Sequence, residues 1–334
     1  MGSVLKVEEL YTSFQVKQGE AKVVNGLSFE VKEGQLLGLV GESGSGKSVA
    51  AASIMGRVRK PGVIKSGRVI YGEEVDILQL PEDKARAYRG KEISLIAANA
   101  RGHLNPLLTV GDQIVDTCIA HGTMKKKEAR AIAVEMLKAV GIPDPQRRFY
   151  SYPHELSGGM AQRCMIAMAL VNSPRLLIAD DATNGLDVTV QAQIMDLIIQ
   201  MIKTRKMSGV FITHDLGVVA QCCDEIAIMY CGQIVEQAAV GAFYDAPCHP
   251  YSVDLMGSLP EKLGDDSQRG SKDTLVSPLC LPSGCMYHPR CRDATKLCRM
   301  KMPELCQVSG THWVRCHHAK QLAEKGGAKD GGIA

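Results

Sequence analysis

The sequence predicts an α/β fold built on a mainly parallel, doubly wound sheet. Short apolar runs of strand length, such as Leu36–Val40 and Leu176–Ala179, alternate with longer segments whose apolar residues recur every three or four positions. That alternation is typical of parallel strands joined by helices that cover both faces of the sheet. The chain has 334 residues, more than one domain of ~100–200 residues needs, so a second part is expected.

The N-terminal segment predicts an edge β-subdomain. MGSVLKVEELYTSF alternates apolar and polar residues as a strand does, and it lacks the apolar core of a signal peptide. We expect this subdomain to end near residue 35. A strand, a glycine-rich loop and a helix should follow to about Arg57, and further strands should run through ISLIAA, residues 93–98.

The glycine-rich loop GESGSGKS, Gly41–Ser48, fits the phosphate-loop pattern G-x-x-x-x-G-K-[ST]. Glycines let the backbone wrap a polyphosphate, so that its N–H groups and the positive end of the next helix face the phosphates. Lys47 can reach the β and γ oxygens, and the Ser48 hydroxyl can ligate Mg²⁺. An ordinary Gly/Ser turn is the alternative. The predicted nucleotide-binding residues are Gly41, Ser43, Gly44, Ser45, Gly46, Lys47 and Ser48.

Two adjacent carboxylates, Asp180 and Asp181, end the apolar strand Leu176–Ala179. In phosphoryl transfer the first would hold Mg²⁺, and the second would orient or deprotonate the attacking water. The alternative is that the pair caps the helix that follows. The position downstream of a phosphate loop favours the catalytic interpretation.

Helices are predicted on both sides of that strand. In MKKKEARAIAVEMLKAVGI, one face at helical spacing carries Ala129, Ile132, Ala133, Met136 and Val140. After Asp187 the same spacing recurs at Ile194, Leu197, Ile198 and Met201.

Charge and hydropathy argue against two classes of function. Lys plus Arg number 39 and Asp plus Glu 36, which leaves no basic field of the kind that nucleic-acid binders need. No apolar run reaches the ~18–20 residues that cross a bilayer. We therefore expect no nucleic-acid partner, and a chain that works in the cytoplasm and attaches to a membrane only through other subunits.

The segment SYPHELSGGMAQRCMIAMALVNSPRLLIAD, residues 151–180, resembles the signature region of the ATP-binding cassette (ABC) family. The resemblance implies an ABC-type P-loop ATPase that binds ATP and Mg²⁺, with a cassette over residues 1–243 and a helical arm over about 98–160. In that family the signature of one cassette closes over ATP held by another. Ser157, Gly158 and Gly159 would therefore contact the partner's nucleotide. A serine hydroxyl and bare glycine amides at a helix start suit an anion.

Further residues match family elements by position. His214, after the apolar run GVFIT, matches the switch histidine that touches the γ-phosphate, although a histidine after a strand is by itself more often structural. Asp187 matches the D-loop carboxylate that contacts the opposite site. Phe14 is the candidate to stack on adenine, with Tyr11 as its rival.

Two positions depart from the family pattern. Ala98 stands where related importers have the Q-loop glutamine, and Asp181 stands where they have the catalytic glutamate. Aspartate is shorter by one methylene, about 1.5 Å. A displacement of ~1 Å can cost on the order of a hundredfold in rate. We expect this chain's own site to bind ATP but to hydrolyse it slowly or not at all, unless Asn99 replaces the glutamine or Asp181 still orients water.

Six of the twelve cysteines fall between Cys280 and Cys316. Disulfides are rare in intracellular proteins, so clustered thiols suggest a metal site or free structural thiols. Residues 244–334 resemble the C-terminal extension of oligopeptide, dipeptide and nickel importer ATPases. The cysteines that match are Cys285, Cys291, Cys298 and Cys316. Four thiolates suit a [4Fe–4S] cluster, with tetrahedral Zn²⁺ as the alternative and Cys306 as a substitute ligand.

The resemblance implies the ATP-binding subunit of an importer at the cytoplasmic face of the inner membrane. Its partners would be a second, non-identical ABC ATPase subunit, two transmembrane permease subunits and an extracytoplasmic solute-binding protein that delivers a small peptide or related solute. A soluble cassette protein acting on ribosomes or DNA is the alternative. Ribosome-acting members usually carry two cassettes in one chain, whereas this sequence has one phosphate loop.

Overall fold

The computed structural model describes residues 2–122, 124–183, 185–258 and 276–319, which form two units. The described residues of the first unit lie within 1–5, 31–35 and 76–211, and those of the second lie within 6–30, 36–75 and 212–334. Neither is continuous in sequence, because the chain passes between them several times. Of the extension expected over 244–334, residues 259–275 and 320–334 lie outside the described part.

An edge sheet of four strands lies almost entirely in the second unit. Its order is β2 (Gly19–Lys32), β1 (Ser3–Val16), β4 (Gly62–Tyr71) and β5 (Val75–Asp76). The alternating N-terminal segment forms β1 as predicted. The boundary expected near residue 35 was too early, because β4 pairs with β1 and adds residues 62–76 to the same sheet.

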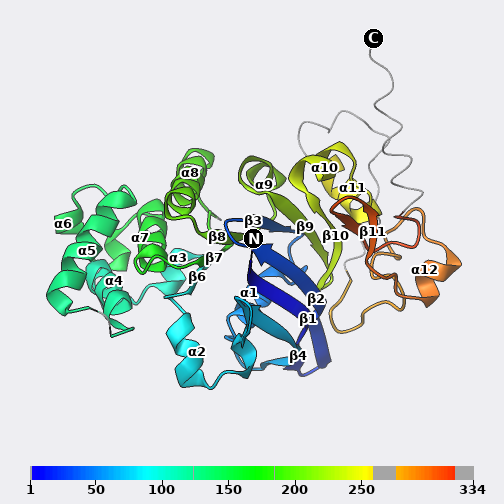
Figure 1. Cartoon of the computed structure of the whole chain (residues 1–334), viewed down its shortest axis with the longest axis horizontal. Coiled ribbons are helices and arrows are strands. Elements are labelled where there is room, and N and C mark those ends of the chain that lie inside the picture. The colour runs from blue at the N-terminus through cyan, green and yellow to red at the C-terminus, as the bar shows by residue number, and fades with distance from the viewer. Residues whose placement is uncertain (1, 123, 184, 259–275, 320–334) are drawn as a thin grey trace, which may run out of the picture. The chain divides into compact units, whose positions relative to one another are not determined.

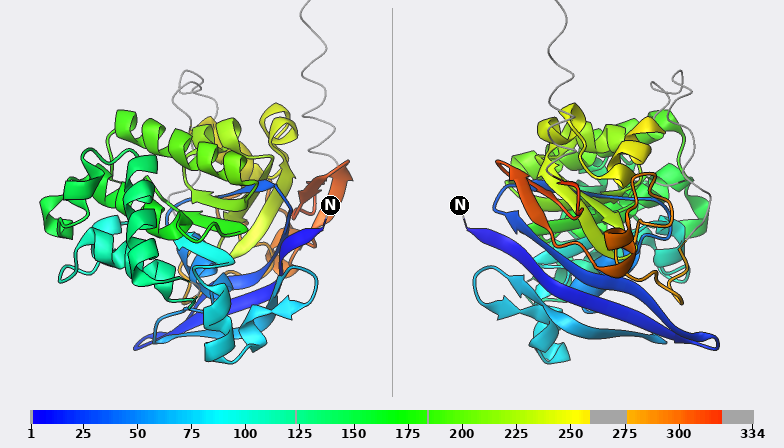
Figure 2. Two further views of the ribbon diagram at one scale, coloured as in Figure 1. Left: turned by 60° about the vertical axis from the view of Figure 1, so that its left-hand side comes forward. Right: turned by 90° about the vertical axis from the view of Figure 1, so that its right-hand side faces the viewer.

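The core strands of the second unit combine parallel and antiparallel pairing. The fully buried β3 (Leu36–Val40) runs parallel to β9 (Glu225–Tyr230). β10 (Gln233–Ala239) continues the sheet antiparallel to β9, followed by β12 (His312–Val314) and β11 (Cys306–Ser309), as the right-hand view of Figure 2 shows. The cysteine-rich segment therefore contributes two short strands that the sequence pattern did not predict.

The helices of the second unit are short. They are α1 (Lys47–Ile54), α9 (Leu216–Cys222), α10 (Val240–Asp245), α11 (Pro250–Gly257) and α12 (Lys296–Met300). The buried ring of Tyr230 comes from β9, and those of Tyr251 (in α11) and Tyr287 come from the extension, with ring centroids 4.6–5.4 Å apart. These aromatic contacts attach the extension to the core of this unit.

In the first unit, β6 (Ile93–Ile96) runs parallel to β7 (Leu176–Asp180), which neighbours β8 (Ser208–Thr213). The 3₁₀ turn η1 (Ile77–Gln79) and the helices α2 (Glu82–Tyr88), α3 (Ala100–His103) and α8 (Val188–Arg205) complete this part. No helix among the described residues is both long and apolar enough to cross a bilayer.

The predicted helical arm is a group of packed helices (Figure 1). It contains α4 (Val110–Ile119), α5 (Lys126–Ala139), α6 (Pro145–Arg148), the 3₁₀ turn η2 (Pro153–Glu155) and α7 (Gly158–Leu170). α5 packs on α4 and α7 and buries the predicted face, with Ile132 only half-buried. Leu137 is buried as well, because α5 has neighbours on more than one side.

Candidate functional site

The loop Gly41–Ser48 connects the buried strand β3 to α1, as the motif predicts. Gly41 is required by close packing, because a Cβ there would lie 2.3 Å from the carbonyl oxygen of Met229 on the neighbouring strand. Gly46 caps α1 with a φ of 102°, and a Cβ there would lie 2.6 Å from the Val23 carbonyl oxygen. The first N–H groups of α1, which have no partner within the helix, are the donors that suit an anion.

Lys47 is held by the loop itself. Its side chain is buried, and Nζ donates to the carbonyl oxygens of Gly41 (2.6 Å) and Glu42 (3.0 Å) and lies 3.4 Å from Ser45 Oγ. Neutral carbonyls are weaker partners for an ammonium than phosphate oxygens are. The ammonium can therefore exchange these contacts for a nucleotide.

The two aromatic candidates lie on opposite faces of β1. Thr12 Oγ1 lies 2.8 Å from Ser53 Oγ in α1, so this face of the strand is turned toward the helix that follows the phosphate loop. Because side chains alternate along a strand, Phe14 shares that face and Tyr11 does not. Phe14 is half-buried against Gly62, and Tyr11 is exposed.

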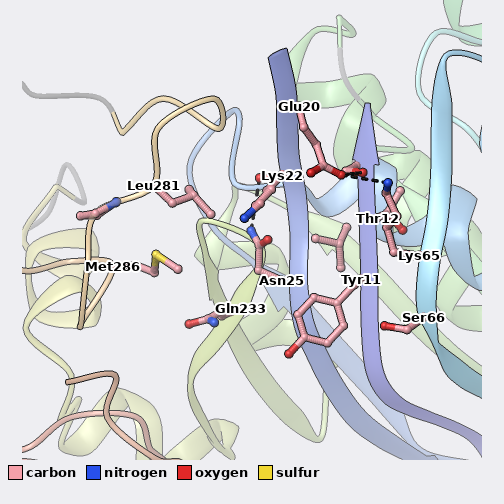
Figure 3. A pocket seen from close by; sticks show the side chains of 13 residues that line it. Tyr11, Thr12, Glu20, Lys22, Asn25, Lys65, Ser66, Gln233, Leu281 and Met286 are labelled. Carbon is pink, nitrogen blue, oxygen red and sulfur yellow. Dashed lines mark hydrogen bonds and ion pairs between the residues drawn. The ribbon is translucent and has the colours of Figure 1, made fainter. Parts of the chain in front are cut away.

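Tyr11 lines a separate groove of about 680 Å³ (Figure 3). Lys65 and Glu20 form an ion pair of 3.1 Å on one side, and Leu281 and Met286 of the extension lie on the other. None of the lining residues belongs to Gly41–Ser48.

In the first unit, β7 ends at Asp180, which is buried, and Asp181 follows half-buried with a φ of 42°. This left-handed conformation turns the chain sharply at the end of the strand. The alternative that the pair caps the next helix is wrong. Asp187 is the N-cap of α8, and its carboxylate accepts a hydrogen bond from Val190 N at 3.0 Å.

The predicted signature residues form the start of α7. Ser157 is its N-cap, with Oγ accepting from Met160 N at 3.2 Å, and Gly158 and Gly159 are its first two residues. A Cβ on Gly159 would lie 3.0 Å from the side chain of Val190 in α8. The starts of α7 and α8 therefore lie together, which brings the signature residues close to Asp187.

Three remaining candidates follow strands. His214 is exposed directly after β8, and Asp215 caps α9 by accepting from Gly217 N at 2.8 Å. Ala98 follows β6 and is half-buried. Asn99 has a φ of 59°, and its side chain lies over its own short helix, with Nδ2 2.9 Å from where a Cβ on Gly102 would stand.

The four predicted cysteines line one cavity of the extension. Cys285, Cys291, Cys298 and Cys316 share it with His318, whose Nε2 lies 3.8 Å from Cys298 Sγ and whose N–H donates to Cys316 Sγ at 3.4 Å. Cys306 does not line the cavity, since its thiol donates to the Val314 carbonyl oxygen. Among the described residues, no three of these sulfurs lie within 4.8 Å of one another.

Burial shifts the titration of these thiols. Desolvation raises the pKa of Cys285, raises that of Cys291 to about 11 and raises that of Cys316 to about 12. The three side chains are therefore thiols at neutral pH. A metal centre that binds them as thiolates would release protons, and its affinity would rise with pH.

A second polar cluster of the second unit was not predicted from the sequence. The buried Glu236 in β10 accepts from the backbone N–H groups of Cys248 (2.8 Å) and His249 (2.7 Å) and pairs with His312 Nε2 (2.7 Å). Burial alone would lower the pKa of His312, but its contacts with Cys248 and Glu236 outweigh that and raise the pKa to about 9. The cluster ties β12 and the start of α11 to β10.

Because of the His312–Glu236 ion pair, the free energy of unfolding should fall as the pH becomes alkaline. His312 has a folded-state pKa of about 9 and an unfolded value of about 6.5, so its contribution is complete below pH 6.5 and is lost as pH rises through 9. We expect the free energy of unfolding in urea to fall by up to about 3 kcal/mol across that window. His312→Gln should remove this slope, and an equal slope in both proteins would contradict the assignment.

Two known protein-family models match the chain. A family model described as ABC transporter matches residues 24–184, and one described as oligopeptide/dipeptide transporter, C-terminal region, matches 235–298. The chain is 43% identical to the dipeptide transport ATP-binding protein DppD of Haemophilus influenzae, covering 94% of this chain and 95% of that one. It is 42% identical to the oligopeptide transport ATP-binding protein AppD of Bacillus subtilis, covering 95% and 97%.

Solved structures agree with this placement. The dimeric post-hydrolysis state of the ATP-binding cassette MJ0796, bound to ADP and Pi, matches with a TM-score of 0.63 and 26% identity over 71% of this chain and 98% of that one. The structure of cbiO1 from Clostridium perfringens shares the fold, with a TM-score of 0.60 and 24% identity. Because relatives above 40% identity cover nearly all of it, the chain belongs to the ABC transporter family of ATPases and carries the C-terminal region of the oligopeptide/dipeptide transporters.

Proposed function

We propose that the chain is the ATP-binding subunit of an ABC importer that couples ATP binding and hydrolysis to the uptake of a small peptide or related solute. The observation that supports this most is the similarity to dipeptide and oligopeptide transport ATP-binding proteins over at least 94% of the chain. The family match at residues 235–298 adds to it, because those residues lie outside the nucleotide-binding motifs. The cassette would comprise residues 1–243, with its arm at about 98–160, and the extension 244–334.

In this proposal ATP binds at Gly41–Ser48, with Lys47 on its β and γ phosphates and Mg²⁺ held by Ser48 and Asp180. Phe14 stacks on adenine, which its position on the α1 side of β1 supports. The signature residues Ser157–Gly159 and the D-loop residue Asp187 contact the nucleotide of the partner cassette, which agrees with their proximity at the starts of α7 and α8. Asp181 stands in the place of the carboxylate that orients the attacking water, and His214 senses the γ-phosphate.

The partners proposed are a second, non-identical ABC ATPase, two permease subunits and an extracytoplasmic solute-binding protein, with this chain at the cytoplasmic face of the membrane. A non-identical partner is supported by the two departures at Ala98 and Asp181, because a slow site here requires a competent one elsewhere. The direct test is purification of the tagged chain from detergent-solubilised membranes. Permease subunits should co-purify in stoichiometric amounts, whereas co-sedimentation with ribosomes in their place would contradict the proposal.

The thiol cavity suits a [4Fe–4S] cluster held by Cys285, Cys291, Cys298 and Cys316. A single tetrahedral Zn²⁺ with Zn–S bonds of ~2.3 Å would need sulfurs about 3.8 Å apart, and no three of the described sulfurs come within 4.8 Å. A [4Fe–4S] cluster holds its cysteine ligands farther apart than a single ion does, because the cluster itself lies between them. When bound, it would cross-link segments of the extension through iron–thiolate bonds.

Anaerobically purified protein should therefore be brown and contain iron and acid-labile sulfide at about four per chain. Cys316→Ser should lose both, because its sulfur lines the cavity. The matched control is Cys280→Ser, since Cys280 is exposed and outside the cavity. Colourless protein with one zinc, or equal iron loss in both variants, would contradict the cluster.

A further inference from the structure

Arg290, a residue of the extension, forms a two-pronged ion pair with the phosphate loop. Its guanidinium donates to both carboxylate oxygens of Glu42, at 2.8 and 3.0 Å, across 248 residues of sequence. Glu42 is the second residue of the loop Gly41–Ser48. The Arg290 side chain is 10% exposed and that of Glu42 35%, so the pair is largely shielded from solvent. Parallel N–H···O bonds of this type are strong and fix orientation.

The backbone of Glu42 is held on both sides. Its N–H donates to the Tyr251 hydroxyl at 2.9 Å, and its carbonyl oxygen accepts from Lys47 Nζ at 3.0 Å and from Ser45 N at 3.1 Å. Glu42 is therefore connected both to the lysine that is to bind phosphate and, through Arg290 and Tyr251, to the elements that follow β10. Any displacement of its carboxylate would be transmitted to the carbonyl that positions Lys47.

Arg290 is itself fixed by aromatic rings. Its guanidinium lies 5.8 Å from the ring centroid of Tyr230 and 5.6 Å from that of Tyr287, and the Tyr287 hydroxyl donates to Asp254. The hydrogen bonds with Glu42 raise the pKa of Arg290 further above its usual value. Arg290 also directly precedes Cys291, so the thiol cavity and the phosphate loop are connected through adjacent residues of the chain.

A carboxylate inside a loop that binds polyphosphate is unfavourable by itself, because like charges repel and the repulsion grows in a partly desolvated site. We propose that Arg290 is a positioning residue for ATP binding: it neutralises Glu42 and fixes the phosphate loop, so that the C-terminal extension sets the loop's affinity for nucleotide phosphates. This inference rests on the proposed function of Gly41–Ser48. It assigns the extension a role in the nucleotide site.

The test is a double-mutant cycle read as the Kd for ATP of the purified full-length chain. Arg290→Ala should raise the Kd on the order of tenfold, because it leaves the Glu42 carboxylate uncompensated beside the phosphates. In the Glu42→Gln background the same change should raise the Kd less than about threefold, because no charge remains to neutralise. If Arg290 acted only through the packing of the extension, Arg290→Ala would raise the Kd equally in both backgrounds.

The matched control is Arg299→Ala, which removes the same charge from an exposed position of the extension and should leave the Kd unchanged. Should Arg290→Ala fail to fold, Arg290→Gln enters the same cycle with the same expected results, since it removes the charge but keeps a polar side chain of similar length. An unchanged Kd in the Arg290 variant, or an equal rise in both backgrounds, overturns the inference. If the Arg290 variant and Lys47→Ala both bind ATP normally, the proposed nucleotide site itself is wrong. If Lys47→Ala loses ATP binding and the Arg290 variant does not, the nucleotide site stands and the role of Arg290 is wrong.

Discussion

Lys47→Ala is expected to abolish ATP binding at this chain's own site. The ammonium is buried in the loop and donates to its carbonyl oxygens. Gly41–Ser48 contains no second cationic residue that could take its place against the phosphates. Titration with a fluorescent ATP analogue, followed by competition with ATP, measures the loss. Lys126→Ala, at an exposed position at the start of α5, is the charge-matched control and should bind as the unaltered protein does. Normal affinity in the Lys47 variant would contradict the nucleotide site.

ATP hydrolysis at this chain's own site is expected to be slow or absent. In a heterodimer whose partner has lost its catalytic glutamate, we expect turnover to vanish while one ATP stays trapped at this chain. Combining Ala98→Gln with Asp181→Glu should then restore part of the lost rate, because the pair returns the missing amide and moves the carboxylate forward by about 1.5 Å. The gain can approach a hundredfold, given how steeply rate depends on such placement.

The matched control is Asn99→Gln, which lengthens the neighbouring amide side chain but leaves Ala98 and Asp181 unchanged. Asn99 is the N-cap of α3 and its side chain lies over Gly102 of that helix, so we expect no gain from lengthening it. Full turnover in the heterodimer with the altered partner and the unaltered chain would show that this site is active and would contradict the expectation.

The sequence predicted those parts of the site that are local in the chain. Gly41–Ser48 and Asp180 each adjoin a buried strand whose apolar run is visible over a few positions. Ser157 was identified by the resemblance of its segment to the family signature, and it lies at the start of α7. The four cysteines that line one cavity were also found, because their spacing resembles a known extension.

Contacts between distant segments were not predicted. Glu42 occupies a variable position of the phosphate-loop motif, and Arg290 lies 248 residues away, so neither has a local signal. A carboxylate in a loop that binds anions indicates that a positively charged partner lies nearby. The sequence does not indicate where in the chain that partner is. Glu236 and His312 are likewise 76 residues apart. The strands β11 and β12 were missed because a short, cysteine-rich segment carries little alternation.

Transport itself tests the central claim most directly. The measurement is uptake of a labelled di- or oligopeptide in membrane vesicles that contain both ATPase subunits, the permeases and the binding protein, with ATP supplied on the cytoplasmic side. We expect uptake to require ATP, and replacement of this chain by its Lys47→Ala variant to abolish uptake. Uptake at the unaltered rate with that variant, or ATP-driven uptake in vesicles that lack this chain, would contradict its role as the ATP-binding subunit of a peptide importer.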